Sequence, residues 1–398
     1  MNLKATFVHV HRAPGLGSAR PLALGLALLA LFALAAAAVQ AEPIRRVGQN
    51  PRGLALGGTG MSYSDDEMAL YYNPAGLGAV KNIWVEVLPI ALEASPDGAT
   101  FLQDKAAEGD SNIGSLSGVA QLIEDNIGKD LHYRAFAYPT GVFGLGRGLS
   151  FGAGLFYETE ADILFRNQAS PEADAYYRKD SGAALGFAFP LAEGRFLVGI
   201  SGRNITREVG DETISSAELA IAAANDELDL EQTLNIQEGT GTAYDLGIIW
   251  RIESFSTTRS QLAATVQNVG GADLGDAGEI KQEVSVGFAM KPQFSRLVRG
   301  LFAVEFRDAT FEATDDESSE KRTHVGFELG VLPQDDSTSL VTGRVGWGQG
   351  GISYGLEIAL WHSFNIQYVY YEQEYGERAG EDLRKRHILQ LNVIGFTL

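Results

Sequence analysis

Charged residues of both signs recur along the sequence after residue 82, at positions that alternate with apolar ones. One face of each such segment therefore carries charge and the other does not. Two chemistries fit: a polar path for a substrate, or Arg–carboxylate pairs that tie a protein interior together, because buried charges must be paired. The mixed signs favour the ion pairs. The residues on this face are Glu86, Arg134, Glu158, Arg203, Asp245, Arg251, Glu283, Glu305, Arg307, Glu328, Arg344 and Glu357.

Catalytic chemistry has little support in the sequence. The histidines after residue 41 are far apart and lack the spacing of metal ligands. The glycine-rich stretch 53–60 does not have the G-x-G-x-x-G pattern of a dinucleotide site. We expect no catalytic residue, no metal and no cofactor, and keep a membrane hydrolase with a Ser/His pair as the weakest hypothesis. The histidines are His132, His324, His362 and His387.

Several large apolar residues share the spacing of the charged face. A pocket for a hydrophobic ligand on this face would need such residues, because ligand pockets are lined mainly by apolar and aromatic side chains. The candidates for the pocket are Trp84, Leu88, Phe136, Tyr138 and Phe156.

The alternation predicts strands with two different faces. We count fourteen segments of about ten residues, which begin near residues 82, 131, 149, 181, 195, 241, 259, 281, 299, 322, 338, 352, 364 and 385. Long polar connections alternate with short turns, except at 348–351. This pattern is typical of an all-β, 14-stranded antiparallel transmembrane β-barrel, with long loops outside and short turns in the periplasm. A soluble β-sandwich also alternates, but its outward face would be polar and its loops evenly short.

Residues 1–41 have the order of a secretory signal peptide: basic residues, an apolar run over 22–39, and small residues before Glu42. A retained anchor helix is the alternative, since the run approaches the ~20 residues that span a bilayer. Without this segment the chain has 28 basic and 51 acidic residues, and a net charge of −23. Such a chain would repel nucleic acid. Two acidic stretches, 115–130 and 216–234, have helical spacing and are interpreted as helices in extracellular loops, with disorder as the alternative.

Residues 42–81 contain no alternating segment and precede the predicted barrel (82–398). In an even-stranded barrel both chain ends face the periplasm, so this stretch must lie below the barrel or fold into it. Gly57, Gly58 and Gly60 allow close approach of backbones, and Pro74 cannot donate to a ladder. We therefore predict a periplasmic hatch or plug over 42–81.

The run RGLALGGTG, an acidic stretch and then ALYYNPAGL resemble the N-terminal hatch of the FadL-type superfamily of outer-membrane proteins. The superfamily includes transporters of long-chain fatty acids and aromatic hydrocarbons, as well as PorV-like and TraF-type barrels. The resemblance implies a fourteen-stranded barrel in the outer membrane of a Gram-negative bacterium. Its lumen would be plugged around an Asn-Pro-Ala motif, here Asn73, Pro74 and Ala75. The motif run covers only about residues 52–77.

Two functions remain open. The first is passive transport of hydrophobic compounds, of the long-chain fatty acid or hydrocarbon class, which would enter through the extracellular loops and leave when the hatch shifts. The second is a non-transporting PorV-like or TraF-type barrel that acts as a partner or scaffold for secreted or envelope proteins. The expected partners are membrane lipids and a hydrophobic small molecule, or an envelope protein. The sequence does not fix the oligomeric state.

Overall fold

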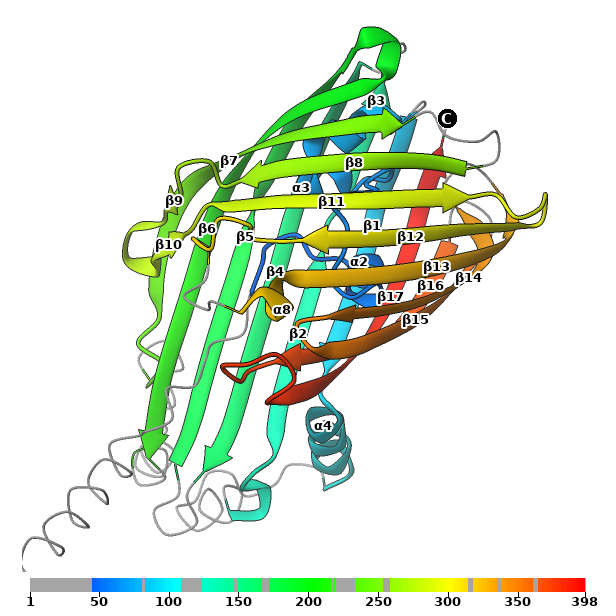
Figure 1. Ribbon diagram of the computed structural model, residues 1–398. Helices are drawn as coiled ribbons and strands as arrows, with labels where there is room; N and C mark the ends of the chain where they lie inside the picture. Colours follow the sequence, from blue (N-terminus) through cyan, green and yellow to red (C-terminus); the bar gives the residue numbers. More distant parts are fainter. Residues whose placement is uncertain are drawn as a thin grey trace, which may run out of the picture. The chain divides into compact units, whose positions relative to one another are not determined.

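The computed structural model describes residues 45–80, 83–108, 124–145, 149–166, 172–215, 218, 233–252, 258–313, 318–334, 338–360 and 364–397. Consecutive strands pair antiparallel, and the sheet closes because the last strand pairs with the first. The sheet has 15 strands, but β2 and β3 share one position between β1 and β4. The described residues therefore build a closed barrel wall with fourteen positions, which confirms the predicted fold (Figure 1).

The wall strands agree closely with the predicted segments. Predicted starts lie within two residues of the observed ones except for β5 and β7, which begin earlier in the sequence than predicted. The strands are β1 (Ile83–Ala94), β2 (Asp130–Ala137), β3 (Thr140–Gly144), β4 (Ser150–Arg166), β5 (Glu172–Leu191), β6 (Phe196–Ser215), β7 (Gln237–Ile252), β8 (Thr258–Gln267), β11 (Glu283–Pro292), β12 (Val298–Phe306), β13 (Thr323–Pro333), β14 (Ser339–Gly348), β15 (Gly351–Leu360), β16 (Phe364–Glu374) and β17 (Leu383–Thr397).

The outer face of the wall is apolar in its central band, and nearly all charged residues within that band face inward. Leu185, Leu246 and Leu356 are about half exposed, whereas Glu158 and Asp245 are fully buried. A soluble protein would show the reverse arrangement. An outward apolar band around a polar interior is the arrangement of a barrel surrounded by lipid, in which each backbone amide finds its partner within the closed sheet.

The wall is uneven in height. Strands β4 to β7 have 17, 20, 20 and 16 residues, whereas β11 to β16 have 9 to 11. The exposed apolar residues of the long strands stop at Tyr157 and Tyr244, and beyond them the outer face carries polar residues such as Lys179 and Glu208. The ends of β4–β7 therefore project beyond the apolar band, as the long green strands of Figure 1 show.

The described helices outside residues 45–80, the segment that is called the hatch here for its position only, are not part of the wall. The predicted helices at 115–130 and 216–234 fall mostly outside the described residues, and the helix α4 was not predicted. Among the described residues, no helix has the length and apolarity to cross a bilayer. Outside the hatch the further elements are α4 (Pro96–Glu108), η2 (Ala192–Gly194), β9 (Ala272–Asp273), η3 (Gly275–Ala277), β10 (Glu279–Ile280) and α8 (Ser319–Arg322).

The ladder of β1 is interrupted near its middle. β1 pairs with β3 up to Glu86 and with β2 from Ile90 onward, so residues 87–89 lie opposite Tyr138 and Pro139. Across this interruption the inward positions change from even to odd numbers. Leu88 is therefore 46% exposed on the outer face, and its predicted position in the lumen is wrong.

Candidate functional site

The segment 45–80 runs inside the barrel from one end of the lumen to the other. Arg45 contacts the extracellular part of β4, and Val80 precedes β1 at the periplasmic end. The segment contains three short helices, α2 (Pro51–Ala55), α3 (Ala69–Tyr72) and η1 (Pro74–Ala79). Nearly all side chains from Gly53 to Gly78 are buried. The sequence left open whether this segment lies below the barrel or within it. In the structure it lies within the barrel.

The Asn73-Pro74-Ala75 motif forms a tight turn against glycines of the wall. Asn73 accepts a hydrogen bond from the Ala75 amide at 3.1 Å and donates from Nδ2 to the Met61 carbonyl at 3.0 Å. The facing wall residues are Gly199 and Gly247, which are ladder partners on β6 and β7. A Cβ on Gly199 would overlap the Pro74–Ala75 peptide, and one on Gly247 would overlap the Asn73 amide. The motif and the wall are therefore in backbone contact.

Gly57 and Gly58 of the hatch meet the opposite wall, whereas Gly60 packs within the hatch. Gly57 and Gly58 have φ of +74° and +85°, in the region that favours glycine. A Cβ on Gly57 would collide with the backbone of Trp347 on β14, and one on Gly60 would collide with the ring of Tyr72. Gly57 also donates to Ser353 Oγ at 2.9 Å and accepts from His324 Nδ1 at 2.6 Å. Because the carbonyl oxygen of Gly57 can only accept a hydrogen bond, the Nδ1 atom of His324 must carry the proton.

Carboxylates of the wall bind the hatch from the same side. Glu305 Oε1 accepts from the amides of Gly60 and Ser62 and from Ser62 Oγ, at 2.7–3.0 Å. Glu328 lies 3.0 Å from Arg52 and 2.7 Å from Arg344, and Arg52 also pairs with Asp66 at 2.6 Å. These contacts confirm the ion-pair interpretation for much of the charged face.

The remaining predicted lumen charges are mostly buried in similar pairs. Arg251 differs from them, because it is half-buried near the periplasmic end of β7. The pairs involving predicted residues are Arg134–Glu158, Arg203–Asp245, Arg307–Glu283, Arg344–Glu328 and Arg344–Glu357, while Glu86 accepts from Asn392.

Burial and neighbouring charges shift the pKa of several hatch residues. Burial raises the pKa of Tyr72 to about 12. It also raises the pKa of Glu67 well above its ordinary value, and the carboxylates of Glu86 and Asp66 add to this effect. Burial opposes the charge of Arg52, but Glu328, Asp65 and Asp66 raise its pKa well above the ordinary value. Burial thus raises the pKa of Glu67 and also that of Asp66, whereas the carboxylates around Arg52 stabilise its charge.

His132, Glu160 and Asp162 bring possible metal ligands within 4.8 Å of one another. His132 lies 2.6 Å from Asp162, and Arg45 lies 3.0 Å from Glu160 and 2.8 Å from Asp162. Arg178 is a further cation, 3.0 Å from Glu160. Because cations already compensate both carboxylates, the group is an ion-pair network rather than a metal centre.

A serine motif escaped the sequence analysis. Residues 351–355 read Gly-Ile-Ser-Tyr-Gly, the G-x-S-x-G pattern of hydrolase nucleophiles. In those enzymes the serine occupies a turn between a strand and a helix, but Ser353 lies within β15, where it donates to the Ala55 carbonyl at 3.1 Å. His324 instead contacts Gly57, and His362 lies outside the described residues. Ser353 therefore holds the hatch.

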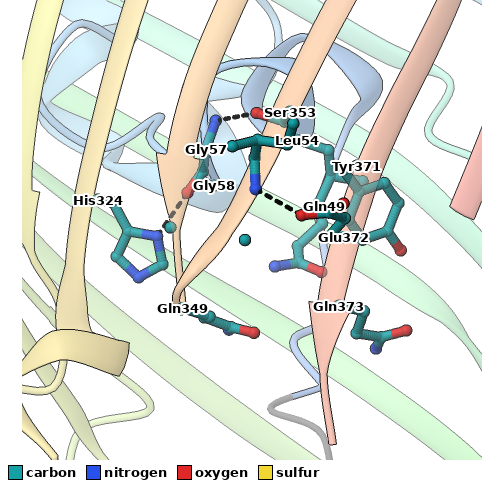
Figure 2. Close-up of a pocket in the computed structure, with 13 residues that line it drawn as sticks. Gln49, Leu54, Gly57, Gly58, His324, Gln349, Ser353, Tyr371, Glu372 and Gln373 are labelled. Atoms are coloured by element: carbon teal, nitrogen blue, oxygen red, sulfur yellow. Dashed lines mark hydrogen bonds between the residues drawn. The ribbon is translucent and has the colours of Figure 1, made fainter. Parts of the chain in front are cut away.

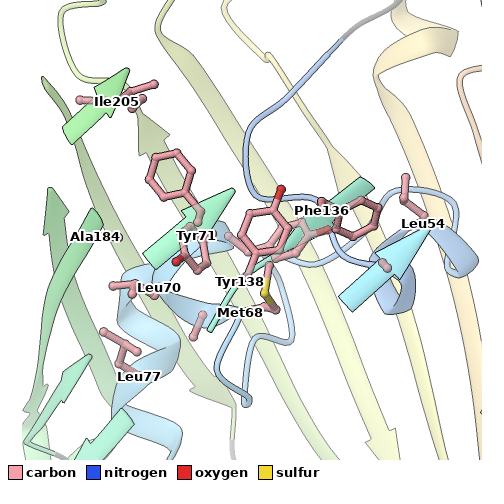
Figure 3. Close-up of a cluster of buried hydrophobic side chains, with 14 of the residues drawn as sticks. Leu54, Met68, Leu70, Tyr71, Leu77, Phe136, Tyr138, Ala184 and Ile205 are labelled. Carbon is pink, nitrogen blue, oxygen red and sulfur yellow. The ribbon is translucent and has the colours of Figure 1, made fainter. Parts of the chain in front are cut away.

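Three of the predicted pocket residues come together around the hatch. Phe136, Tyr138 and Phe156 are 3% exposed and pack with Tyr71 of α3, whose ring centroid lies 5.3 Å from Tyr138 and 6.2 Å from Phe156. Trp84 is partly buried at the edge of the same cluster. Figure 3 shows Tyr71, Tyr138 and Phe136 close together, with Met68 and Leu70 of the hatch beside them. The sequence predicted the wall rings, but not that Tyr71 of the hatch would cover them.

A small cavity lies at the other side of the hatch. Its lining includes Gln49, Leu54, His324, Gln349 and Tyr371 (Figure 2). Its volume is about 40 Å³. Small-molecule sites usually have ~300–1,000 Å³, so this cavity holds water-sized molecules only.

Comparison with known proteins identifies the fold. No known family profile matches the sequence, and no curated protein matches it. Among solved structures, a monoaromatic hydrocarbon channel, the TodX deltaS2S3 mutant, aligns over 88% of this chain and 98% of its own, with 13% identity and a TM-score of 0.50. The toluene transporter TbuX of Ralstonia pickettii aligns over 88% and 99%, with 12% identity and a TM-score of 0.48. At this identity the first likeness concerns the fold alone, and it supports the closed antiparallel barrel that the sequence predicted.

Proposed function

We propose that this chain is a passive outer-membrane channel for hydrophobic compounds, with the segment 45–80 as its closed hatch. The observation that carries the proposal is the aromatic cluster of Phe136, Tyr138 and Phe156 inside a lumen whose wall also carries many charged residues. If the interior of the barrel served only to hold the hatch in place, further ion pairs or small residues would be sufficient there. A cluster of rings gives apolar molecules a favourable place within the polar interior.

The outer surface and the fold support the location. The apolar band matches a bilayer, and residues 1–41 would direct export before removal at Ala41. The similar fold of a monoaromatic hydrocarbon channel supports a hydrophobic substrate of small size. Long-chain fatty acids are the second substrate class, since an alkyl chain can also pack against the apolar rings of the cluster.

The cluster also explains why the hatch must move. Tyr71 of α3 packs on the wall rings and donates to the Leu155 carbonyl at 3.1 Å. A ligand that reaches Tyr138 and Phe156 must displace this ring. Passage then requires no cofactor and no energy source, only a shift of the hatch between two arrangements.

Uptake by cells tests the proposal. The chain would be expressed in a Gram-negative host that lacks its own hydrophobic transporters, and uptake of labelled toluene and oleate would be compared. Deleting residues 47–79 should change uptake, and Phe156→Ala should change it less. Phe189→Ala, on the outer face, is the matched control. Unchanged uptake by the deletion variant, with the barrel still assembled, would contradict the proposal.

A second function, a barrel that binds an envelope or secreted protein, is favoured by one observation. The ends of β4–β7 project beyond the apolar band and present polar residues such as Thr206 and Thr240. Shortening β6 and β7 between Thr206 and Thr240 would separate the two functions. A transporter should keep its uptake, whereas a partner barrel should lose co-purification of one defined protein.

A further inference from the structure

Two consecutive arginines at the start of the hatch bind different walls of the barrel. Arg45 lies 3.0 Å from Glu160 and 2.8 Å from Asp162, both on β4. Arg46 lies 2.6 Å from Glu283, the first residue of β11. Four strands, β5 to β8, separate these walls in the sheet. At ~4.8 Å for each of the five steps, the carboxylates are separated by roughly 24 Å along the wall. Residues 45–49, here called the strap, therefore cross the extracellular end of the lumen.

Arg45 is held firmly. Its guanidinium carbon lies 3.7 Å from the ring centre of Tyr176, in addition to its two carboxylate partners. Burial opposes its charge, but Glu160 and further groups raise its pKa well above the ordinary value. A guanidinium with two carboxylates and an aromatic face has most of its binding groups satisfied.

Arg46 is held less well. It shares Glu283 with Arg307, whose Nε lies 3.0 Å from the same carboxyl group. Arg46 Nη1 is buried without a hydrogen-bond partner among the described residues. Burial lowers the pKa of Arg46, and the like charge of Arg307 lowers it further. An unpaired buried donor beside a like charge is unfavourable.

The strap also contacts the aromatic cluster. The amide of Gly48 donates to the hydroxyl of Tyr138 at 3.2 Å, and this hydroxyl donates to Glu158 at 2.5 Å. Gly48 has φ of +87°, and a Cβ there would lie 2.8 Å from Cβ of Tyr71. Movement of the strap at residue 48 would therefore release both Tyr138 and Tyr71.

We propose that the strap opens by release of Arg46 from Glu283, while Arg45 stays on Glu160 and Asp162 as the pivot. Residues 46–49 then swing away from Tyr138 and uncover the cluster at the extracellular end. Arg45 thus anchors the strap, and Arg46 holds it closed. The proposal rests on the proposed function only for the identity of what passes once the strap is open.

Site-specific labelling tests this opening without a substrate. The chain has no cysteine, so Val47→Cys provides a single thiol in the strap, and its reaction with a membrane-impermeant maleimide is followed on purified protein in detergent. Arg46→Gln should accelerate labelling roughly tenfold, by loss of a charge-assisted contact. Arg45→Gln should change it less than about twofold, since release of Arg46 still limits the rate. Arg378→Gln, exposed at the same end, is the matched control.

A fourth variant should act in the opposite direction. Arg307→Gln leaves Glu283 to Arg46 alone and removes the like charge, so labelling of the thiol introduced at position 47 should slow. Heat-dependent mobility on SDS gels checks that every variant is a folded barrel. Equal acceleration by Arg45→Gln and Arg46→Gln, no acceleration by either, or faster labelling in the Arg307 variant would overturn the proposal. None of these outcomes depends on whether hydrocarbons are transported.

Discussion

The hatch has two contact surfaces that differ in chemistry. On one side, the Asn73–Gly78 turn packs closely on wall glycines such as Gly199 and Gly247. On the other side, Arg52, Gly60 and Ser62 contact the carboxylates of Glu328 and Glu305. Separation of the first surface exposes apolar area and loses close packing. Separation of the second returns charges to water, which offsets much of the lost attraction. The hatch is therefore expected to loosen first on its charged side.

Loss of a shared carboxylate should have the largest effect on the charged side. Glu328→Gln leaves Arg52 and Arg344 buried with less compensation, and should lower the free energy of unfolding by about 3 kcal/mol. Glu193→Gln, in an exposed turn, is the control. Urea unfolding in detergent, followed by tryptophan fluorescence, measures both. Equal midpoints would show that the charged side contributes no stability.

An added methyl group probes the packed side. A Cβ at Gly247 overlaps the side chain of Asn73, so Gly247→Ala should lower the free energy of unfolding by about 1–3 kcal/mol. Gly343→Ala is a matched change on β14, where a Cβ would meet nothing within 4 Å. The same urea titration applies. If the two variants unfold alike, the Asn73 side chain does not pack closely on Gly247.

The hydrogen bonds within the motif should matter somewhat less. Asn73→Ala removes the bonds to the Ala75 amide and the Met61 carbonyl, with an expected loss of about 1–2 kcal/mol. Asn50→Ala removes the cap of α2 and serves as the comparison, at about 1 kcal/mol. Thermal unfolding monitored by circular dichroism ranks the two. A smaller effect at Asn73 than at Asn50 would reduce the motif to an ordinary turn.

The smallest effect is a dependence on pH. The pKa of Glu67 is raised in the folded protein, because of burial and the nearby carboxylates of Glu86 and Asp66. The folded state thus binds this proton more tightly than the unfolded state. Stability from the protonated form is present below the unfolded pKa, and is lost as the pH rises through the folded one. Glu67→Gln should reduce the fall in unfolding free energy between mildly acidic and alkaline pH. An unchanged pH profile would argue against a buried proton at this site.

The wall could be predicted almost completely from the sequence, because its period of two reports directly which side faces lipid. The prediction failed at Leu88, where the ladder of β1 is interrupted. Alternation near the C-terminus changes parity between Val393 and Ile394, and the β1–β17 ladder skips the pair Val87–Ile394. Paired residues point to the same face, so a change of parity in one strand requires the same change in its neighbour. Leu88 could have been corrected by that argument.

The hatch could be located in the sequence from its glycines and its Asn-Pro-Ala motif. The wall residues that it contacts could not be predicted. The contacts of Arg52 with Glu328, and of Tyr71 with Tyr138, join residues far apart in the sequence. Alternation fixes the face of a residue and not the depth of its contact in the lumen. For the same reason, the charged face was identified residue by residue, whereas the strap at Arg45 and Arg46 emerged only from the structure.

Hydrogen–deuterium exchange within the hatch tests the central claim most directly. Amides of 53–62, which bind the charged walls, should exchange faster than those of 69–78, which pack on the wall glycines. Exchange that is equal in the two segments, or faster in 69–78, would contradict a hatch that loosens from its charged side to let hydrophobic molecules pass.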